Sequence, residues 1–322
     1  MAAVSADKGN VKPMLRPITC GVVSALLVML APLGAQSQES EPQQTFRSAI
    51  DVVSIQATVR DSRGRMVHGL TAADFEVLDN GQRRPIIELR SDQESPLSVA
   101  ILVDMSGSMR MSAKIDMVRQ AYDSVLVQLT SGRDEAGVFT FDSSLHERTG
   151  FTDDIKTLKS ALADFQPFGS TSLYDAVAET ARHVTARTST HRAIVVLTDG
   201  IDTSSSLTAG EVSGLASAID VPVYVVATVA ALDQRQMLEA VQRPVASDTA
   251  DLRDLAEWTG GRLVVVSTFT ESVTLATSIV QELRQQYVLA IEAAPERQWR
   301  RLEVRVKHPS ATVKSRSGYF GS

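Results

Sequence analysis

Hydrophobic and polar positions divide the middle of the chain into alternating short and long apolar segments. Leu97 to Val103 is a mostly apolar run, typical of a strand that is buried on both faces of a parallel sheet. Met111 to Leu129, which follows it, carries apolar residues at the spacing of one helical face. Further short runs and amphipathic segments alternate up to residue 286. This alternation predicts an α/β fold, with a doubly wound, mostly parallel, Rossmann-like sheet over residues 96–286.

The same patterns give bounds for each element. The predicted strands cover residues 97–103, 135–141, 145–149, 193–197, 221–227 and 263–266. The predicted helices cover residues 111–129, 155–165, 173–184, 209–219, 252–258 and 272–286. Residues 229–250 show no clear period and are interpreted as a long loop with one helical turn.

The two flanks of this domain have the pattern of strands. Residues 47–95 contain alternating apolar positions and an Asn80-Gly81 pair, which favours a type I′ hairpin turn. Residues 287–322 predict three strands, which alone would expose an apolar face. We therefore expect residues 47–95 and 287–322 to form one small β domain from both chain ends.

The N-terminus has the features of a secretion signal. Three basic residues precede a mostly apolar stretch from Ile18 to Leu33, and small residues end at Ala35. Because this stretch is shorter than the ~20 residues of a transmembrane helix, we interpret residues 1–35 as a cleaved signal peptide. An uncleaved membrane anchor is the alternative. Residues 36–46 are polar and predict a disordered lead-in. We expect a secreted or periplasmic protein.

Cleavage after Ala35 changes the chemistry of the chain. It removes Cys20, the only cysteine, so the mature chain forms neither disulfides nor thiolate metal sites. It also takes the formal net charge from −6 to −8, since residues 1–35 hold three bases and one acid. An acidic exported protein lacks the basic surface that nucleic acid requires. A membrane is an expected partner only if the signal is kept.

Candidate chemistry lies in three loops of the predicted α/β domain. Asp104, Ser106 and Ser108 follow the first strand, Thr171 precedes a helix, and Asp199 follows another strand. Loops at one edge of an open α/β sheet can converge on a ligand. Their carboxylate and hydroxyl oxygens suit Mg²⁺, with Mn²⁺ or Ca²⁺ as alternatives. Taken singly, each of these residues also fits a helix cap or a turn.

Together these motifs resemble the metal-ion-dependent adhesion site of von Willebrand factor type A (VWA) domains. The matching segments are Asp104-Met105-Ser106-Gly107-Ser108, Gly169-Ser170-Thr171 and Val195 to Gly200. The resemblance implies that Ser106, Ser108 and Thr171 contact Mg²⁺ through their hydroxyls, and that Asp104 and Asp199 act directly or through water. Residues 69–75, 286–289 and 316–320 also resemble the flanks of a bacterial VWFA-related family.

These features predict a binding module rather than an enzyme. An open metal position would accept an acidic side chain of a protein partner. A metal-assisted hydrolase is one alternative, but the motifs place neither His nor Glu as a general base. An assembly factor beside an intracellular ATPase is another, and the secretion signal speaks against it.

Overall fold

The computed structural model describes residues 51–91, 94–110, 112–163, 166–189, 191–200, 202–218, 220–229 and 252–321. The predicted signal peptide, the predicted lead-in and the predicted loop over 229–250, except its first residue, lie outside the described residues. Within them, no helix has both the length and the apolar character needed to cross a membrane.

Six strands form the central sheet, in the order β10-β9-β8-β5-β6-β7. Their bounds are Leu97–Asp104 for β5, Glu135–Phe141 for β6, Leu145–Thr152 for β7, His191–Thr198 for β8, Val223–Thr228 for β9 and Leu263–Val266 for β10. Neighbouring strands are parallel except β7, which runs antiparallel to β6. The chain leaves β5 and β8 towards opposite sides of the sheet. Their shared carboxyl edge is therefore the topological switch point, where ligands bind in such sheets.

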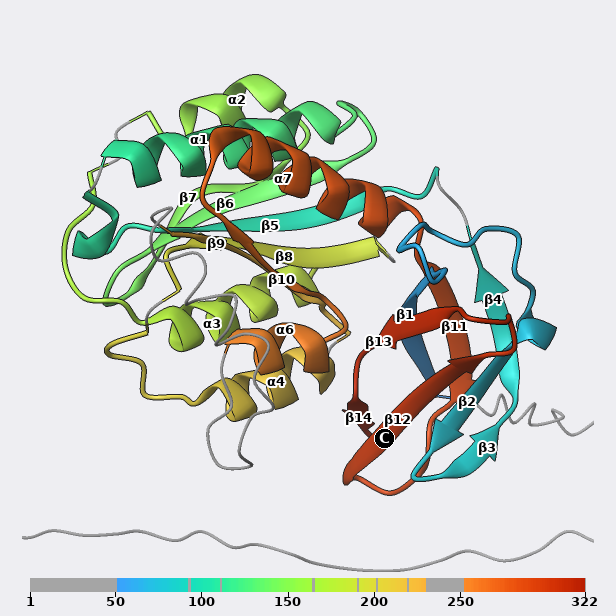
Figure 1. The fold of residues 1–322 in the computed structure, drawn as a ribbon. Helices are drawn as coiled ribbons and strands as arrows, with labels where there is room; N and C mark the ends of the chain where they lie inside the picture. Colours follow the sequence, from blue (N-terminus) through green and yellow to red (C-terminus); the bar gives the residue numbers. More distant parts are fainter. Residues whose placement is uncertain are drawn as a thin grey trace, which may run out of the picture. The chain divides into compact units, whose positions relative to one another are not determined.

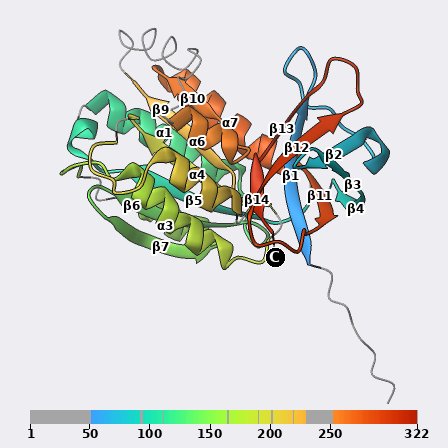
Figure 2. The ribbon, with the colours of Figure 1, turned by 90° about the horizontal axis from the view of Figure 1, so that it is seen from below.

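Helices cover both faces of this sheet (Figure 1). One face carries α1 (Ser112–Gln128), α2 (Ile155–Ser160) and α7 (Phe269–Arg284). The other carries α3 (Leu173–Thr185), α4 (Ala209–Ala218) and α6 (Leu252–Trp258), which Figure 2 shows from below. Alternate side chains of β5 point into the two cores, since Ile101 and Val103 pack in the first and Ala100 and Leu102 in the second. This arrangement confirms the predicted α/β fold class.

Eight further strands form two four-stranded sheets, ordered β13-β1-β11-β4 and β14-β12-β2-β3. Their bounds are Val52–Arg60 for β1, Phe75–Asp79 for β2, Gln82–Arg84 for β3, Ile86–Arg90 for β4, Tyr287–Glu292 for β11, Trp299–Val306 for β12, Thr312–Ser315 for β13 and Gly318–Phe320 for β14. A short 3-10 helix, η1 (Ala72–Asp74), precedes β2. One apolar cluster is built from both sheets and therefore from both chain ends.

Several bounds differ from the sequence prediction. β7 extends to Thr152 because its residues pair with β6 in a hairpin, which the alternation of apolar and polar residues does not reveal. Helix α2 ends at Ser160 instead of residue 165. The tail contains a fourth strand, β14, which pairs with β12. The predicted hairpin turn is confirmed, since Asn80 and Gly81 both have positive φ and connect β2 to β3.

Helix α7 leads directly into β11 of the β domain, and buried polar side chains fix this junction. Glu282 on α7 is 1% exposed and forms ion pairs with Arg60 of β1 and with Arg262. It also accepts a hydrogen bond of 3.2 Å from the hydroxyl of Tyr224. Gln286 donates to the same hydroxyl over 3.1 Å. The end of α7 is thus tied to both domains.

Arg316, between β13 and β14, is a second tie. It is 4% exposed. Its guanidinium donates to two carbonyl oxygens, that of Ser217 near the end of α4 and that of Ser54 on β1. Its Nε lies 3.4 Å from a carboxylate oxygen of Asp220. One buried cation therefore joins strand β1 to the end of α4.

We expect Arg316→Met to lower the free energy of unfolding by about 3 kcal/mol, because it leaves Asp220 and two carbonyl groups buried without their partner. Urea unfolding measures this loss. Arg301→Met, at an exposed position of β12, is the matched control and should change stability by less than about 0.5 kcal/mol. Equal stability of the two variants would contradict the role given to Arg316.

Candidate metal centre

Asp104 is the last residue of β5, and its side chain is fully buried at the switch point. One carboxylate oxygen accepts a hydrogen bond of 2.8 Å from the backbone N–H of Ser106. The other accepts a hydrogen bond of 2.6 Å from the hydroxyl of Thr198, at the end of β8. One donor follows β5 and the other ends β8, so the carboxylate is fixed between these two strands.

The two serines of the first loop lie together. The hydroxyl oxygens of Ser106 and Ser108 are 3.0 Å apart. Ser106 is buried and Ser108 is exposed, so the pair leads from the interior to the surface. A short 3-10 helix, η2 (Gly107–Arg110), continues the loop towards α1.

The second loop, which holds Thr171, lies against the first. The backbone N–H of Gly107 donates to the carbonyl oxygen of Gly169 over 3.0 Å. The backbone N–H of Phe168 donates to the carbonyl oxygen of Met105 over 2.6 Å. A side chain at residue 107 would meet the Gly169 carbonyl oxygen at 3.3 Å, so glycine permits the close approach. Gly169 has a φ of +95°, which a residue with a side chain rarely adopts.

Thr171 is 3% exposed and is held by the third loop. Its N–H donates to the hydroxyl of Thr203 over 2.9 Å, and its carbonyl oxygen accepts from the N–H groups of Thr203 and Ser204. Thr171 does not cap α3. Instead, Asp202 accepts from the N–H of Leu173 over 2.8 Å and thereby fills the capping role.

Asp199 follows β8 and is 5% exposed. One of its carboxylate oxygens, Oδ2, accepts a hydrogen bond of 2.9 Å from the ammonium group of Lys114 on α1. The other, Oδ1, is buried and has no hydrogen-bond partner among the described residues. A buried carboxylate oxygen without a partner is costly, and such a site favours a cation.

The charges at the site also favour a bound cation. Burial raises the pKa of Asp104, against the hydrogen bonds from Ser106 and Thr198 that lower it, and the negative charge of Asp199 raises it further. Two carboxylates are therefore close enough to repel each other, while one ammonium group lies beside them. The site carries more negative than positive charge.

The predicted site residues come from loops that contact one another. Asp104, Ser106 and Ser108 share one loop, Asp199 adjoins the Thr198 that binds Asp104, and Thr171 joins through the Gly169 backbone. Sequence reasoning missed Thr198, Thr203, Asp202 and Lys114. Thr198 lies within the Val195 to Gly200 motif, but its hydrogen bond to Asp104 was not predicted. Lys114 and Asp202 act across 85 and 29 positions, which no local pattern reveals.

The donor set fits a hard divalent cation. No group of three or more His, Cys, Asp or Glu able to hold a metal occurs within the described part of the chain. A metal at this edge would therefore use hydroxyl oxygens beside the two carboxylates, and such oxygen ligands suit Mg²⁺. The free oxygen of Asp199 is the position in this structure that a cation would satisfy.

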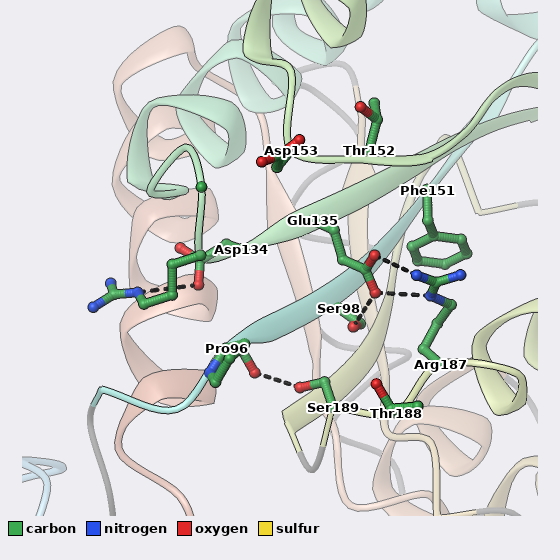
Figure 3. Close-up of a pocket in the computed structure, with 12 residues that line it drawn as sticks. Pro96, Ser98, Asp134, Glu135, Phe151, Thr152, Asp153, Arg187, Thr188 and Ser189 are labelled. Carbon is green, nitrogen blue, oxygen red and sulfur yellow. Dashed lines mark hydrogen bonds and ion pairs between the residues drawn. The ribbon is translucent and has the colours of Figure 1, made fainter.

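A pocket of about 630 Å³ lies at the opposite, amino-terminal edge of the parallel strands (Figure 3). Two of its charged side chains, Arg187 and Glu135, pair with each other. Arg187 donates to both carboxylate oxygens of Glu135 over 2.7 and 2.5 Å and lies over the ring of Phe151, while Glu135 also accepts from Ser98. We therefore interpret these contacts as structural, and the candidate centre is the edge at Asp104.

Comparison with known proteins identifies the α/β domain. Residues 99–202 match the family model of the von Willebrand factor type A domain, and this range contains all five candidate site residues. This segment of the chain is therefore a VWA domain. No curated protein matches the chain significantly.

Solved structures with a similar arrangement include bacterial proteins. BatB from Bacteroides thetaiotaomicron is 20% identical, with 58% of this chain and 97% of that chain covered and a TM-score of 0.45. A von Willebrand factor type A protein from Catenulispora acidiphila is 13% identical, with 84% and 74% covered and a TM-score of 0.48. The PilB minor pilin from Streptococcus sanguinis is 14% identical, with 60% and 62% covered and a TM-score of 0.44.

We expect Asp104→Asn to raise the free energy of unfolding of the metal-free protein at neutral pH, with the amide oxygen accepting from the N–H of Ser106 and the hydroxyl of Thr198 turned to accept from the amide N–H. The reason is that the folded state, in which the pKa of Asp104 is raised, disfavours its ionised carboxylate. The gain should vanish as pH falls below the ordinary pKa of an aspartate, about 3.9, where both states are protonated. Urea unfolding at several pH values measures it. The exposed Asp153→Asn is the control, and a loss of stability in Asp104→Asn at neutral pH would contradict the expectation.

Proposed function

We propose that this chain is an exported protein-binding module that uses Mg²⁺ to grip an acidic side chain of a protein partner. The family match supports a protein-interaction module in general. The observation that carries the metal dependence is the buried oxygen of Asp199 that lacks a partner, close to a second buried carboxylate, Asp104, at the switch point. The N-terminal signal expected from the sequence supports a secreted or periplasmic location.

The chain's own residues would divide the work. Ser106, Ser108 and Thr171 offer hydroxyl oxygens, and Asp104 and Asp199 offer charge. The ion, when bound, supplies a positive centre with a position open to a carboxylate, and Mn²⁺ or Ca²⁺ are alternatives. The exposed position of Ser108 gives the site access to solvent and hence to a partner.

Contacts of the two acids favour binding over catalysis. Within the described residues, the hydrogen-bond partners of Asp104 and Asp199 include a backbone N–H, a threonine hydroxyl and the ammonium group of Lys114. A hydrolase needs a general base within hydrogen-bond reach of its substrate's nucleophile. Here Asp104 accepts hydrogen bonds that hold the loops, and Oδ2 of Asp199 pairs with Lys114, which favours a binding role over that of a general base.

Metal binding is tested by isothermal titration with Mg²⁺. We expect Asp104→Ala to abolish the binding, and Thr171→Val to weaken it by about tenfold or more, the loss typical of an altered metal site. Thr185→Val removes a hydroxyl from the far end of α3 and should leave the affinity unchanged. Unaltered Mg²⁺ affinity in Asp104→Ala would rule out this site.

Partner binding is tested with the immobilised protein and an envelope fraction in the presence of Mg²⁺. A partner should elute with a chelator and should be absent from a parallel column carrying Asp199→Ala. Amidation of the eluted partner's carboxylates should then prevent rebinding, because the site recognises a carboxylate. Rebinding of the amidated partner would refute the acidic-residue mechanism while leaving the metal site intact.

A further inference from the structure

Lys114 has no role in the predicted site, yet its ammonium group pairs with one of the two acids of the candidate metal centre. It lies in the first turn of α1, and its ammonium nitrogen is 2.9 Å from Oδ2 of Asp199. The side chain of Asp199 is 2% exposed and that of Lys114 is 17% exposed. A carboxylate that is so deeply buried requires a counter-ion, and Lys114 is the one that the described structure provides.

We propose that Lys114 is the resident counter-ion of the metal site and that its ammonium group releases Asp199 when a divalent cation binds. This inference rests on the proposed function. Lys114 and an incoming cation compete for one carboxylate, Asp199. The lysine therefore lowers the site's affinity for metal and sets the metal concentration at which the module becomes competent to bind its partner.

Charge balance is the first argument. Asp104 and Asp199 together carry two negative charges, which a divalent cation neutralises by itself. If the ammonium group also stayed on Asp199, the site would hold an excess positive charge, with two cations close together in a largely buried place. Repulsion between charges is screened little there.

The lysine side chain is also suited to leave. Its ammonium group sits on a flexible four-carbon stem and is strongly hydrated in water. Since the side chain is already 17% exposed, it can reach solvent by rotation about its own bonds, with no movement of α1. The loops around Asp104 keep their own hydrogen bonds, none of which involves Lys114.

Release also affects the partner. An ammonium group that leaves Asp199 remains beside the site on α1. It adds positive charge next to the open metal position, which favours the acidic side chain that the proposed function requires. Metal binding and carboxylate binding are thereby coupled through one side chain.

The test measures Mg²⁺ affinity by calorimetry and Mn²⁺ binding by electron paramagnetic resonance, with no partner present. Lys114→Gln removes the charge but keeps a hydrogen-bond donor, and we expect it to bind either metal roughly tenfold more tightly than the unmodified protein. Lys114→Met should do the same, which keeps the test open if one variant folds poorly. Lys159→Met, at an exposed position of α2, changes the net charge equally and should have no effect.

Thermal unfolding provides a second readout. Without metal, Lys114→Gln should unfold at a lower temperature than the unmodified protein, because two buried carboxylates lose their counter-ion. Saturating Mg²⁺ should remove this difference. Lys114→Arg, which keeps the charge, should behave as the unmodified protein does.

The outcomes separate this inference from the proposed function. If the unmodified protein binds Mg²⁺, Asp104→Ala does not, and both Lys114 variants bind as the unmodified protein does, the lysine is no competitor and the inference is overturned while the metal site stands. If neither the unmodified protein nor the Lys114 variants bind metal, both proposals fall. Binding that appears only in the Lys114 variants supports the inference, since the lysine then occupies the site.

Discussion

The buried carboxylate of Asp104 constrains the whole carboxyl edge of the central sheet. A charged group without contact to solvent must be held by donors, and here Ser106 and Thr198 supply them from two different loops. These hydrogen bonds join the ends of β5 and β8, the two strands at which the chain reverses its winding. The acid that orders the edge is thus also the acid around which a cation site can form. Glycine at residues 107 and 169 lets the Thr171 loop approach the same point.

The fold class and most elements of the α/β domain could be predicted from the sequence, because a buried parallel strand such as Leu97 to Val103 and an amphipathic helix such as α1 have distinct periods. The strands that failed lack an alternating pattern of their own. β7 is polar and owes its length to hairpin pairing with β6, and β14 is too short to show alternation. The capping of α3 by Asp202 could not be predicted either, since the acid lies in another loop.

The candidate site, too, could be predicted only in part from the sequence. Its hydroxyl and carboxylate residues could be named because they occupy turns after strands, where loops of an open sheet meet. The side chain that pairs with one of these carboxylates, Lys114, could not be named from the same pattern. Lys114 is one helical residue among several bases, and only the fold brings its ammonium group to Asp199. Likewise, residues 286–289 and 316–320 were singled out in the sequence by a resemblance that predicts no role for them. In the structure, Gln286 and Arg316 are buried donors at the junction of the two domains.

Packing connects this junction to the candidate site. Helix α1, which carries Lys114 near its start, lies along α7, and the hydroxyl of Ser272 on α7 donates to the carbonyl oxygen of Met117 on α1 over 2.8 Å. Helix α7 in turn ends at Glu282 and Gln286 and continues into β11 of the β domain. A shift of α7 would therefore have to break the buried ion pair of Glu282 with Arg60, and a shift of α1 would have to move Lys114 relative to Asp199. Each pair has one buried carboxylate, Glu282 or Asp199, so losing a partner is costly and the packed arrangement of the two helices is favoured. The local release of the Lys114 side chain is the smaller movement, since it breaks one ion pair and leaves the packing of both helices in place.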